Sequence, residues 1–165
     1  ATVGTIGWFA PDLIGAGDNL TQRVLSGLAV AGAIPLILAI RFFLGPVSYA
    51  ARTPGGLFAP LLVVGALIGF LFGNVCQEAF PALAIEPQAF AVVGMAAFFT
   101  GVVRAPVTGI VLVIEMTAAF TTLLPMLVAC FAAMVAANLL NNPPIYESLR
   151  ERLTVELNRP KNKNT

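Results

Sequence analysis

Histidine is absent from the 165 residues, and charged residues make up only 10% of them. Without histidine the chain lacks the commonest catalytic base and metal ligand. A soluble globular domain usually carries about 25% charged residues, so there is too little charge here for a fully solvated surface. We therefore expect no catalytic site, no metal site and no soluble fold.

Charge is missing altogether from two long intervals of the chain. No Asp, Glu, Lys or Arg occurs in residues 53–77 or 116–146, and hydrophobic residues form 58% of the whole. A membrane-spanning helix needs about 20 predominantly apolar residues, and both intervals are long enough to hold one. The sequence predicts an all-α, multi-pass integral membrane protein whose surroundings are the lipid bilayer.

The remaining charge is nearly balanced but unevenly placed. The net charge is +1, which gives no reason to expect a nucleic-acid partner, and five of the nine basic residues lie within residues 150–163. Basic residues close to a membrane span favour the cytoplasmic side, so we expect a cytoplasmic C-terminus. Cys76 and Cys130 lie in or beside apolar runs, where cysteine usually serves as a small packing residue.

The apolar segments are short and are interrupted by proline and glycine. Backbone breaks at membrane depth are tolerated where protein buries them or where they line a cavity, and broken helices that meet near the midplane form many transporter ion sites. The pattern therefore favours transport. Segments are expected at residues 24–44 (ending at a break at Gly45-Pro46), 57–76, 88–103, 105–118 and 121–140, with a loop at 12–19 and an amphipathic helix at 145–157.

Two sets of small residues predict close helix packing. Gly65, Gly69 and Gly73 are spaced four apart, so they lie on one face and let another helix approach. That face could be a dimer seam, but internal packing is the favoured interpretation. Ala129, Ala133 and Ala137 form a similar face, which is compatible with close packing and does not establish a dimer.

The segment Pro54-Gly55-Gly56-Leu57-Phe58-Ala59-Pro60 carries the chemistry. A helix that begins after the two glycines has unpaired N–H groups in its first turn, and its dipole adds partial positive charge there. Inside a membrane such an end binds an anion without any full charge. Pro60 fits the first turn because its missing N–H would have no helical partner. The alternative is an ordinary turn between two apolar segments.

Several motifs in order resemble those of the CLC family of chloride channels and chloride/proton antiporters. Residues 55–60 look like the family's G-G-x-F-x-P signature, and the remaining matches share its order and spacing over about residues 4–157. They are Gly94-Met95-Ala96-Ala97, Arg104-Ala105-Pro106-Val107-Thr108-Gly109, Val113-Ile114-Glu115-Met116-Thr117, Leu124-Pro125-Met126 and Pro144-Ile145-Tyr146.

The resemblance implies an anion site formed by Gly56, Leu57, Phe58, Ala59 and Tyr146. In it, the N–H groups of Leu57 and Phe58 coordinate a central chloride, Ala59 N–H lies toward an outer site, and Tyr146 offers its hydroxyl. Without the family, Tyr146 reads as an aromatic residue of the membrane interface. Chloride would be the transported ion, and no cofactor is expected.

Glu115 is ionisable within an apolar segment, and such a residue is a functional candidate by default. It could relay protons. We favour a structural carboxylate that accepts bonds from helix N-termini or pairs with Arg41 or Arg104, because in the family the gating and proton-transfer glutamates belong to the other half.

The family's pathway is enclosed by two inverted repeats, and this chain resembles only the second. Residues 1–157 are expected to form the C-terminal half of the transmembrane domain, with 158–165 a disordered cytoplasmic tail and no nucleotide-binding tail beyond. The chain begins at Ala1 without a signal-peptide pattern, which indicates a processed or truncated product. Expected partners are chloride, protons in an antiporter, the N-terminal half of the same fold, and a second copy in a homodimer through 105–118 and 120–140.

Three classes of function remain open from sequence. Anion transport leads, as a channel or as a proton-coupled exchanger, and fluoride- or nitrate-selective relatives are variants of it. A non-transporting assembly or regulatory subunit would bind no chloride even beside its partner. An intramembrane enzyme is disfavoured, because the chain shows no paired acids and no serine or cysteine beside a base.

Overall fold

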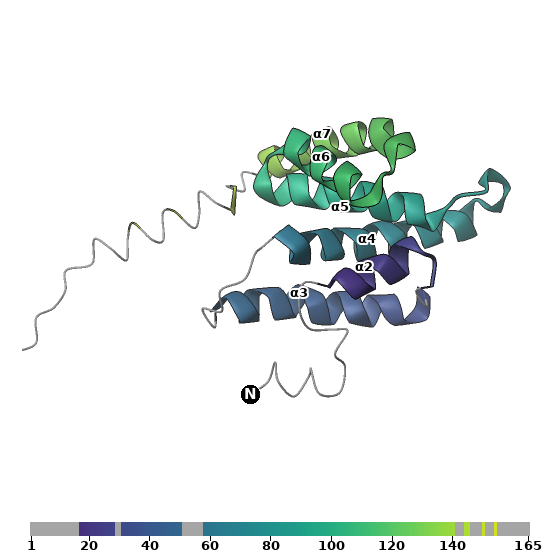
Figure 1. Ribbon diagram of the computed structural model, residues 1–165, viewed down its shortest axis with the longest axis horizontal. Coiled ribbons are helices and arrows are strands. Elements are labelled where there is room, and N and C mark those ends of the chain that lie inside the picture. The colour runs from purple at the N-terminus through teal and green to yellow at the C-terminus, as the bar shows by residue number, and fades with distance from the viewer. Residues whose placement is uncertain are drawn as a thin grey trace, which may run out of the picture.

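Figure 1 shows the computed structural model of the chain, which describes residues 17–28, 31–50 and 58–140, with Pro144, Ile145, Arg150 and Thr154 as isolated positions. These residues contain helices and no strand, as expected for an all-α protein. The α-helices are α2 (Asp18–Leu25), α3 (Ile34–Ala50), α4 (Phe58–Ala79), α5 (Pro87–Val103), α6 (Pro106–Thr117) and α7 (Leu123–Leu139), and the short 3-10 helices are η2 (Ala31–Ala33), η3 (Pro81–Leu83) and η4 (Phe120–Thr122).

The helices are arranged in layers around α4 and α5. In Figure 1, α2 and α3 lie along one side of α4, and α6 and α7 lie along the other side of α5. Leu67 of α4 and Met95 of α5 are almost completely buried between these layers. The largest helix contact, between α4 and α5, therefore forms the middle of the molecule.

The glycines of α4 face α5, which confirms internal packing as their role. A Cβ at Gly65 would lie 2.6 Å from the Gly94 carbonyl oxygen, and one at Gly69 would lie 2.1 Å from the Phe90 carbonyl oxygen. Gly94 in turn leaves room for α4, since its Cβ would lie 2.5 Å from the Gly65 oxygen. The two backbones touch along this seam, as small-residue faces permit in membrane helices.

In the second set of small residues, Ala133 faces α5. A Cβ at Gly101 of α5 would meet the Ala133 Cβ of α7 at 3.9 Å, which is ordinary contact. The outward face of α7 instead carries large apolar side chains with wide exposure. They are Leu124, Val128, Phe131, Val135 and Leu139, exposed by 71%, 65%, 47%, 52% and 77%.

Helix α5 ends sharply, and α6 begins at once. Arg104 follows α5 in the left-handed conformation (φ 65°) and donates its N–H to the Thr100 carbonyl oxygen at 2.8 Å. Pro106 then opens α6, where its missing N–H costs nothing. The expected segments 88–103 and 105–118 are thus confirmed within one residue, and with 17 and 12 residues they remain short for perpendicular spans.

The first third of the described chain differs from expectation. The apolar run 24–44 does not form one segment, because α2 ends at Leu25 and Ser26 and Gly27 form a turn in which Gly27 has φ 72°. The break expected at Gly45-Pro46 is wrong, since α3 continues to Ala50. Neighbouring helices and local adjustment let a membrane helix tolerate proline. The loop expected at 12–19 ends early, because α2 starts at Asp18.

Two helical segments are long and apolar enough to cross a membrane. They are Phe58–Ala79 and Phe120–Leu139, with 22 and 20 residues, and each begins within one of the two charge-free intervals. The first is 50% buried within the molecule and the second only 11%. Both cysteines are free thiols, and Cys130 is fully buried, which fits the packing role expected of it.

Candidate anion site

The N-terminus of α4 is the part of the expected anion site that the structure describes. Phe58 is the first helical residue, Ala59 and Pro60 follow, and the first turn of the helix carries no acidic side chain. The N–H groups of a first turn have no partner within the helix, and the dipole places partial positive charge beside them. This end of α4 therefore has the donors and the charge that an anion needs.

The burial of α4 changes steeply along its first two turns. The Phe58 side chain is 43% exposed, whereas Leu62 and Val63 are 3% and 2% exposed. Helix α4 thus runs from a partly exposed first residue into the packed interior.

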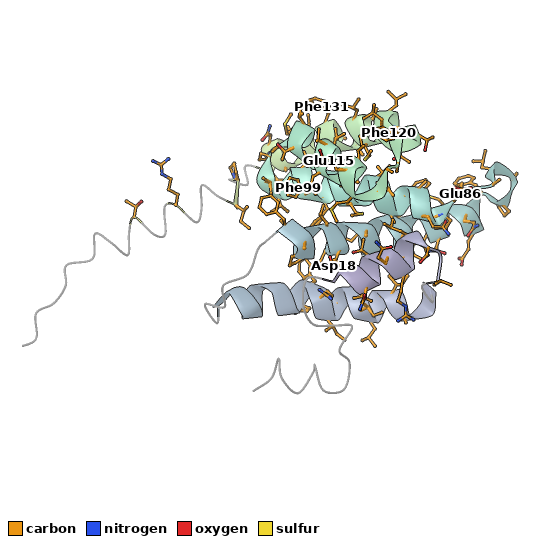
Figure 2. All side chains as sticks on the ribbon, viewed as in Figure 1. Asp18, Glu86, Phe99, Glu115, Phe120 and Phe131 are labelled. Atoms are coloured by element: carbon orange, nitrogen blue, oxygen red, sulfur yellow. The ribbon has the colours of Figure 1, made fainter. Side chains whose placement is uncertain are left out.

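The ring of Phe58 lies on the ring of Phe99 in α5. The two centroids are 5.4 Å apart with 28° between the planes, a stacked arrangement. Phe99 has no exposed surface, and Figure 2 shows it beside the start of α4. The first turn of α4 is therefore docked on a buried ring of the neighbouring helix.

The other expected site residues are not brought together by the described structure. Gly56, Leu57 and Tyr146 lie outside the described residues, as do the amphipathic helix at 145–157, apart from Ile145, Arg150 and Thr154, and the tail at 158–165. Phe58 and Ala59 are where the sequence predicts them, at the start of a helix. The contribution of the remaining three residues stays a prediction.

Arg41 is buried, at 6% exposure, in the middle of α3. The carboxylate of Asp18, in the first turn of α2, interacts electrostatically with it. A Cβ at Gly17 would lie 2.8 Å from the Arg41 Nη1 atom, so the guanidinium reaches the very start of α2. A buried charge is stabilised by a nearby opposite charge, and Asp18 supplies one.

The pairing of Glu115 with Arg41 or Arg104, one of the structural roles expected of it, is wrong, whereas bonds from helix N-termini stay a prediction. Glu115 is exposed in the last turn of α6, on the same face as the exposed Val111 four residues earlier. Arg104 lies before the other end of α6 and Arg41 lies in α3, on the far side of α4. Eleven residues separate Arg104 from Glu115, so the rise along α6, at about 1.5 Å per residue, keeps the two apart.

Arg104 binds α7 instead of Glu115. Its Nη1 atom donates to the Met134 carbonyl oxygen at 3.1 Å and also to the Asn138 Oδ1 atom. Because Arg104 follows the last residue of α5, these bonds connect the α5–α6 turn to the C-terminal part of α7. Hydrogen bonds from a charged donor are about twice as strong as neutral ones. Arg104 therefore stabilises the packing of α5 and α6 against α7.

We expect Arg104→Ala to lower the free energy of unfolding by about 1.5–3 kcal/mol, the usual worth of hydrogen bonds to a charged group. Arg104→Gly should be less damaging by about 1 kcal/mol, because glycine relieves the cost of the left-handed backbone. Asn138→Ala, which leaves the Met134 bond in place, is the milder control. Thermal unfolding in detergent measures the stability of all three variants. Wild-type stability in Arg104→Ala would contradict the stabilising role of Arg104.

Two interactions between helices have no signal in the sequence. The Phe58–Phe99 stack joins residues 41 positions apart, and the electrostatic interaction of Asp18 with Arg41 joins α2 to α3. Each follows from how helices lie against one another. The sequence pointed to Phe58, through the helix start after the two glycines, and to Arg41, but not to the partner of either residue.

The chain matches a family model over most of its length. The model is described as voltage gated chloride channel, and it matches residues 1–138. Among curated relatives, the H(+)/Cl(-) exchange transporter ClcA of Vibrio cholerae serotype O1 is 41% identical over 144 residues, or 87% of this chain and 31% of that protein. The ClcA of Klebsiella pneumoniae is 36% identical over 149 residues, or 90% of this chain and 32% of that protein.

A solved structure agrees with the sequence comparison. The chain resembles the X-ray crystal structure of a slow cyanobacterial Cl−/H+ antiporter with a TM-score of 0.80 and 35% identity, over 87% of this chain and 34% of that one. The chain therefore spans about a third of the length of the relatives it matches. On these matches, together with the helical fold, the chain belongs to the voltage-gated chloride channel family of integral membrane proteins.

Proposed function

We propose that the chain forms the second half of a pathway that moves chloride across a membrane in exchange for protons. The observation that carries this proposal is the start of α4. There a helix begins within the charge-free interval 53–77, with unpaired N–H groups and no acidic side chain in its first turn. Partial charges bind an anion and still release it, as conduction requires. The similar proteins named as exchangers support proton coupling.

In this proposal, Gly56, Leu57, Phe58 and Ala59 supply the backbone side of the anion site and Tyr146 supplies a hydroxyl donor. Chloride is the transported ion, and the proposal includes no enzymatic step and no cofactor. The C-terminus would lie on the cytoplasmic side, because the basic cluster within residues 150–163 favours that side. Residues 1–157 would form the second inverted repeat of the transmembrane domain, followed by a short tail at 158–165.

The first repeat must come from another segment, because the chain covers about a third of its relatives. We expect chloride flux from liposomes when the chain is combined with the part of the Vibrio cholerae exchanger that it does not match, and no flux from either part alone.

Tyr146→Phe should reduce the chloride flux of the combined protein, since it removes one hydroxyl donor. Co-purification of the two parts is the folding control. A folded pair without chloride flux would favour an assembly or regulatory subunit.

We also propose that two copies associate through α6 and α7. The outward face of α7 carries Val128, Phe131 and Val135 with large exposed apolar surfaces. Glu115 is exposed on the adjoining α6 (Figure 2), and a carboxylate that faces lipid is costly. A second copy would cover this face and exclude lipid from the carboxylate.

Tryptophan at Val128 or Val135 should convert the dimer to a monomer, because a bulky apolar side chain is tolerated by lipid but obstructs a packed protein interface. Val75→Trp, at a similarly exposed position on α4 with 62% exposure, is the matched control and should leave the dimer intact. Size-exclusion chromatography with light scattering distinguishes the two states. A wild-type monomer, or dimers that survive both substitutions, would contradict this interface.

A further inference from the structure

The first turn of α4 is held by an aromatic contact that continues into a third helix. Phe58 stacks on Phe99 with 5.4 Å between ring centroids, and Phe99 is fully buried. Behind Phe99 lies Gly109 of α6, where an added Cβ would come within 2.9 Å of the Phe99 Cδ1 atom and 3.1 Å of the Thr100 Oγ1 atom. The Phe99 ring therefore lies between the start of α4 and the backbone of α6.

The position of Phe99 is tightly constrained. The α6 backbone stands against one part of the ring and the Phe58 ring stacks on another. Protein interiors are close-packed, so a displacement imposed at Gly109 is passed to Phe58.

The position of the first turn of α4 depends on its packing. The first N–H groups of a helix make no hydrogen bond to a preceding turn, so no backbone bond within the helix anchors them, and packing of the first turn against neighbouring helices contributes to where they lie. Phe58 begins α4, and its side chain is 43% exposed. Among the described aromatic residues, it stacks only on Phe99. An N–H aimed at an ion must be held within about 0.5 Å of its productive position.

We propose that Phe99 is a positioning residue for the anion site: through the Phe58 ring it aims the Phe58 N–H at the bound anion, and Gly109 fixes Phe99 from α6. Phe99 makes no contact with the ion in this arrangement. The proposal rests on the proposed function, because it refines the site at the start of α4. It also gives α6 a route to that site through packed side chains.

A second aromatic pair provides a matched control within the same two helices. Phe72 of α4 and Phe90 of α5 have centroids 5.8 Å apart with 49° between the planes. Phe90 precedes Phe99 by nine residues, about 13 Å along α5, so this pair joins α4 to α5 far from the anion site. Loss of the Phe90 ring weakens the same helix contact and leaves the first turn of α4 unchanged.

The test compares Phe99→Leu, Gly109→Ala and Phe90→Leu in the chain combined with the complementary part of the Vibrio cholerae exchanger. Leucine keeps a large apolar side chain but removes the stacked ring. Flux is measured against chloride concentration and against nitrate, alongside thermal unfolding. Phe99→Leu and Gly109→Ala should each weaken the apparent chloride affinity about three- to tenfold, the worth of one aromatic contact, and change the chloride-to-nitrate ratio. Phe90→Leu should lower only the unfolding temperature.

The double variant separates a shared route from two independent defects. If Gly109 acts through the Phe99 ring, Phe99→Leu combined with Gly109→Ala should be no worse than Phe99→Leu alone, because contacting residues are not additive. Wild-type affinity and selectivity in Phe99→Leu, or equal changes in Phe90→Leu, would overturn the positioning role while chloride transport stands. A wild-type protein that transports no chloride would overturn the proposed function and this role together.

Discussion

Gly69→Leu is expected to abolish the packing of α4 on α5 and to leave no stably folded protein. Even the first carbon of a side chain at Gly69 would lie 2.1 Å from the Phe90 carbonyl oxygen and 3.1 Å from the Ala91 Cα atom. These are backbone atoms of a helix, so they cannot rotate away as a side chain can. Overpacking of a core costs about 1–3 kcal/mol for a few added carbons, and the contact here is closer than such cases allow. Expression and monodispersity in detergent measure the effect.

Gly69→Ala gives a graded version of the same test, and we expect it to lower the free energy of unfolding by at least about 2 kcal/mol. Gly101→Ala is the control, because its Cβ would meet Ala133 at 3.9 Å without a clash. Since alanine is the better helix former by about 1 kcal/mol, Gly101→Ala should be neutral or stabilising. Equal stability of the two alanine variants would show that α4 and α5 do not touch along the glycine seam.

Phe58→Pro is expected to reduce chloride affinity about 10- to 150-fold, because it removes one N–H donor from a charged ligand, worth about 1.5–3 kcal/mol. Proline is tolerated structurally in the first turn of a helix, where Pro60 already stands. Chloride flux from liposomes that contain the combined protein measures the loss over a range of chloride concentrations.

Phe58→Ala separates the backbone donor from the side chain. Alanine keeps the N–H and removes the ring that stacks on Phe99, so its effect should match Phe99→Leu and stay smaller than that of Phe58→Pro. Unfolding temperature is recorded for both variants. If Phe58→Pro folds and transports chloride with wild-type affinity, the Phe58 N–H does not hold the ion.

The helices α5 and α6 could be predicted from sequence because their ends carry local signals. Pro87 and Pro106 each open a helix, and the Arg104-Ala105 pair separates two apolar runs. Local chemistry of this kind acts within a few residues. The bounds of α5 and α6 were consequently correct to within one residue.

The α2–α3 region could not be predicted as well, since apolar composition hides its turn. Ser26-Gly27 is a turn signal, but apolar residues on both sides favoured a continuous segment. At Gly45-Pro46 the opposite error occurs, because α3 continues through a pair that would usually end a helix. Packing against neighbouring helices decides such positions, and a single sequence does not report it.

The candidate anion site, too, was predicted from sequence only in part. A helix that starts beside Phe58 was predicted, because two glycines and a proline define a helix N-terminus. The role of Phe99 and the partners of Arg104 depend on which helices lie side by side. Glu115 shows the limit most clearly, because a carboxylate among apolar residues suggested a buried partner, whereas the side chain is exposed on α6.

The most direct test of the central claim is the location of a bound anion. Bromide replaces chloride and scatters anomalously, so crystals of the combined, flux-competent protein grown in bromide reveal the ion itself. We expect an anomalous peak within hydrogen-bonding distance of the Phe58 and Ala59 amide nitrogens, at the N-terminus of α4. A protein that transports chloride but shows no bromide at this helix end would contradict an anion site formed by the backbone of α4.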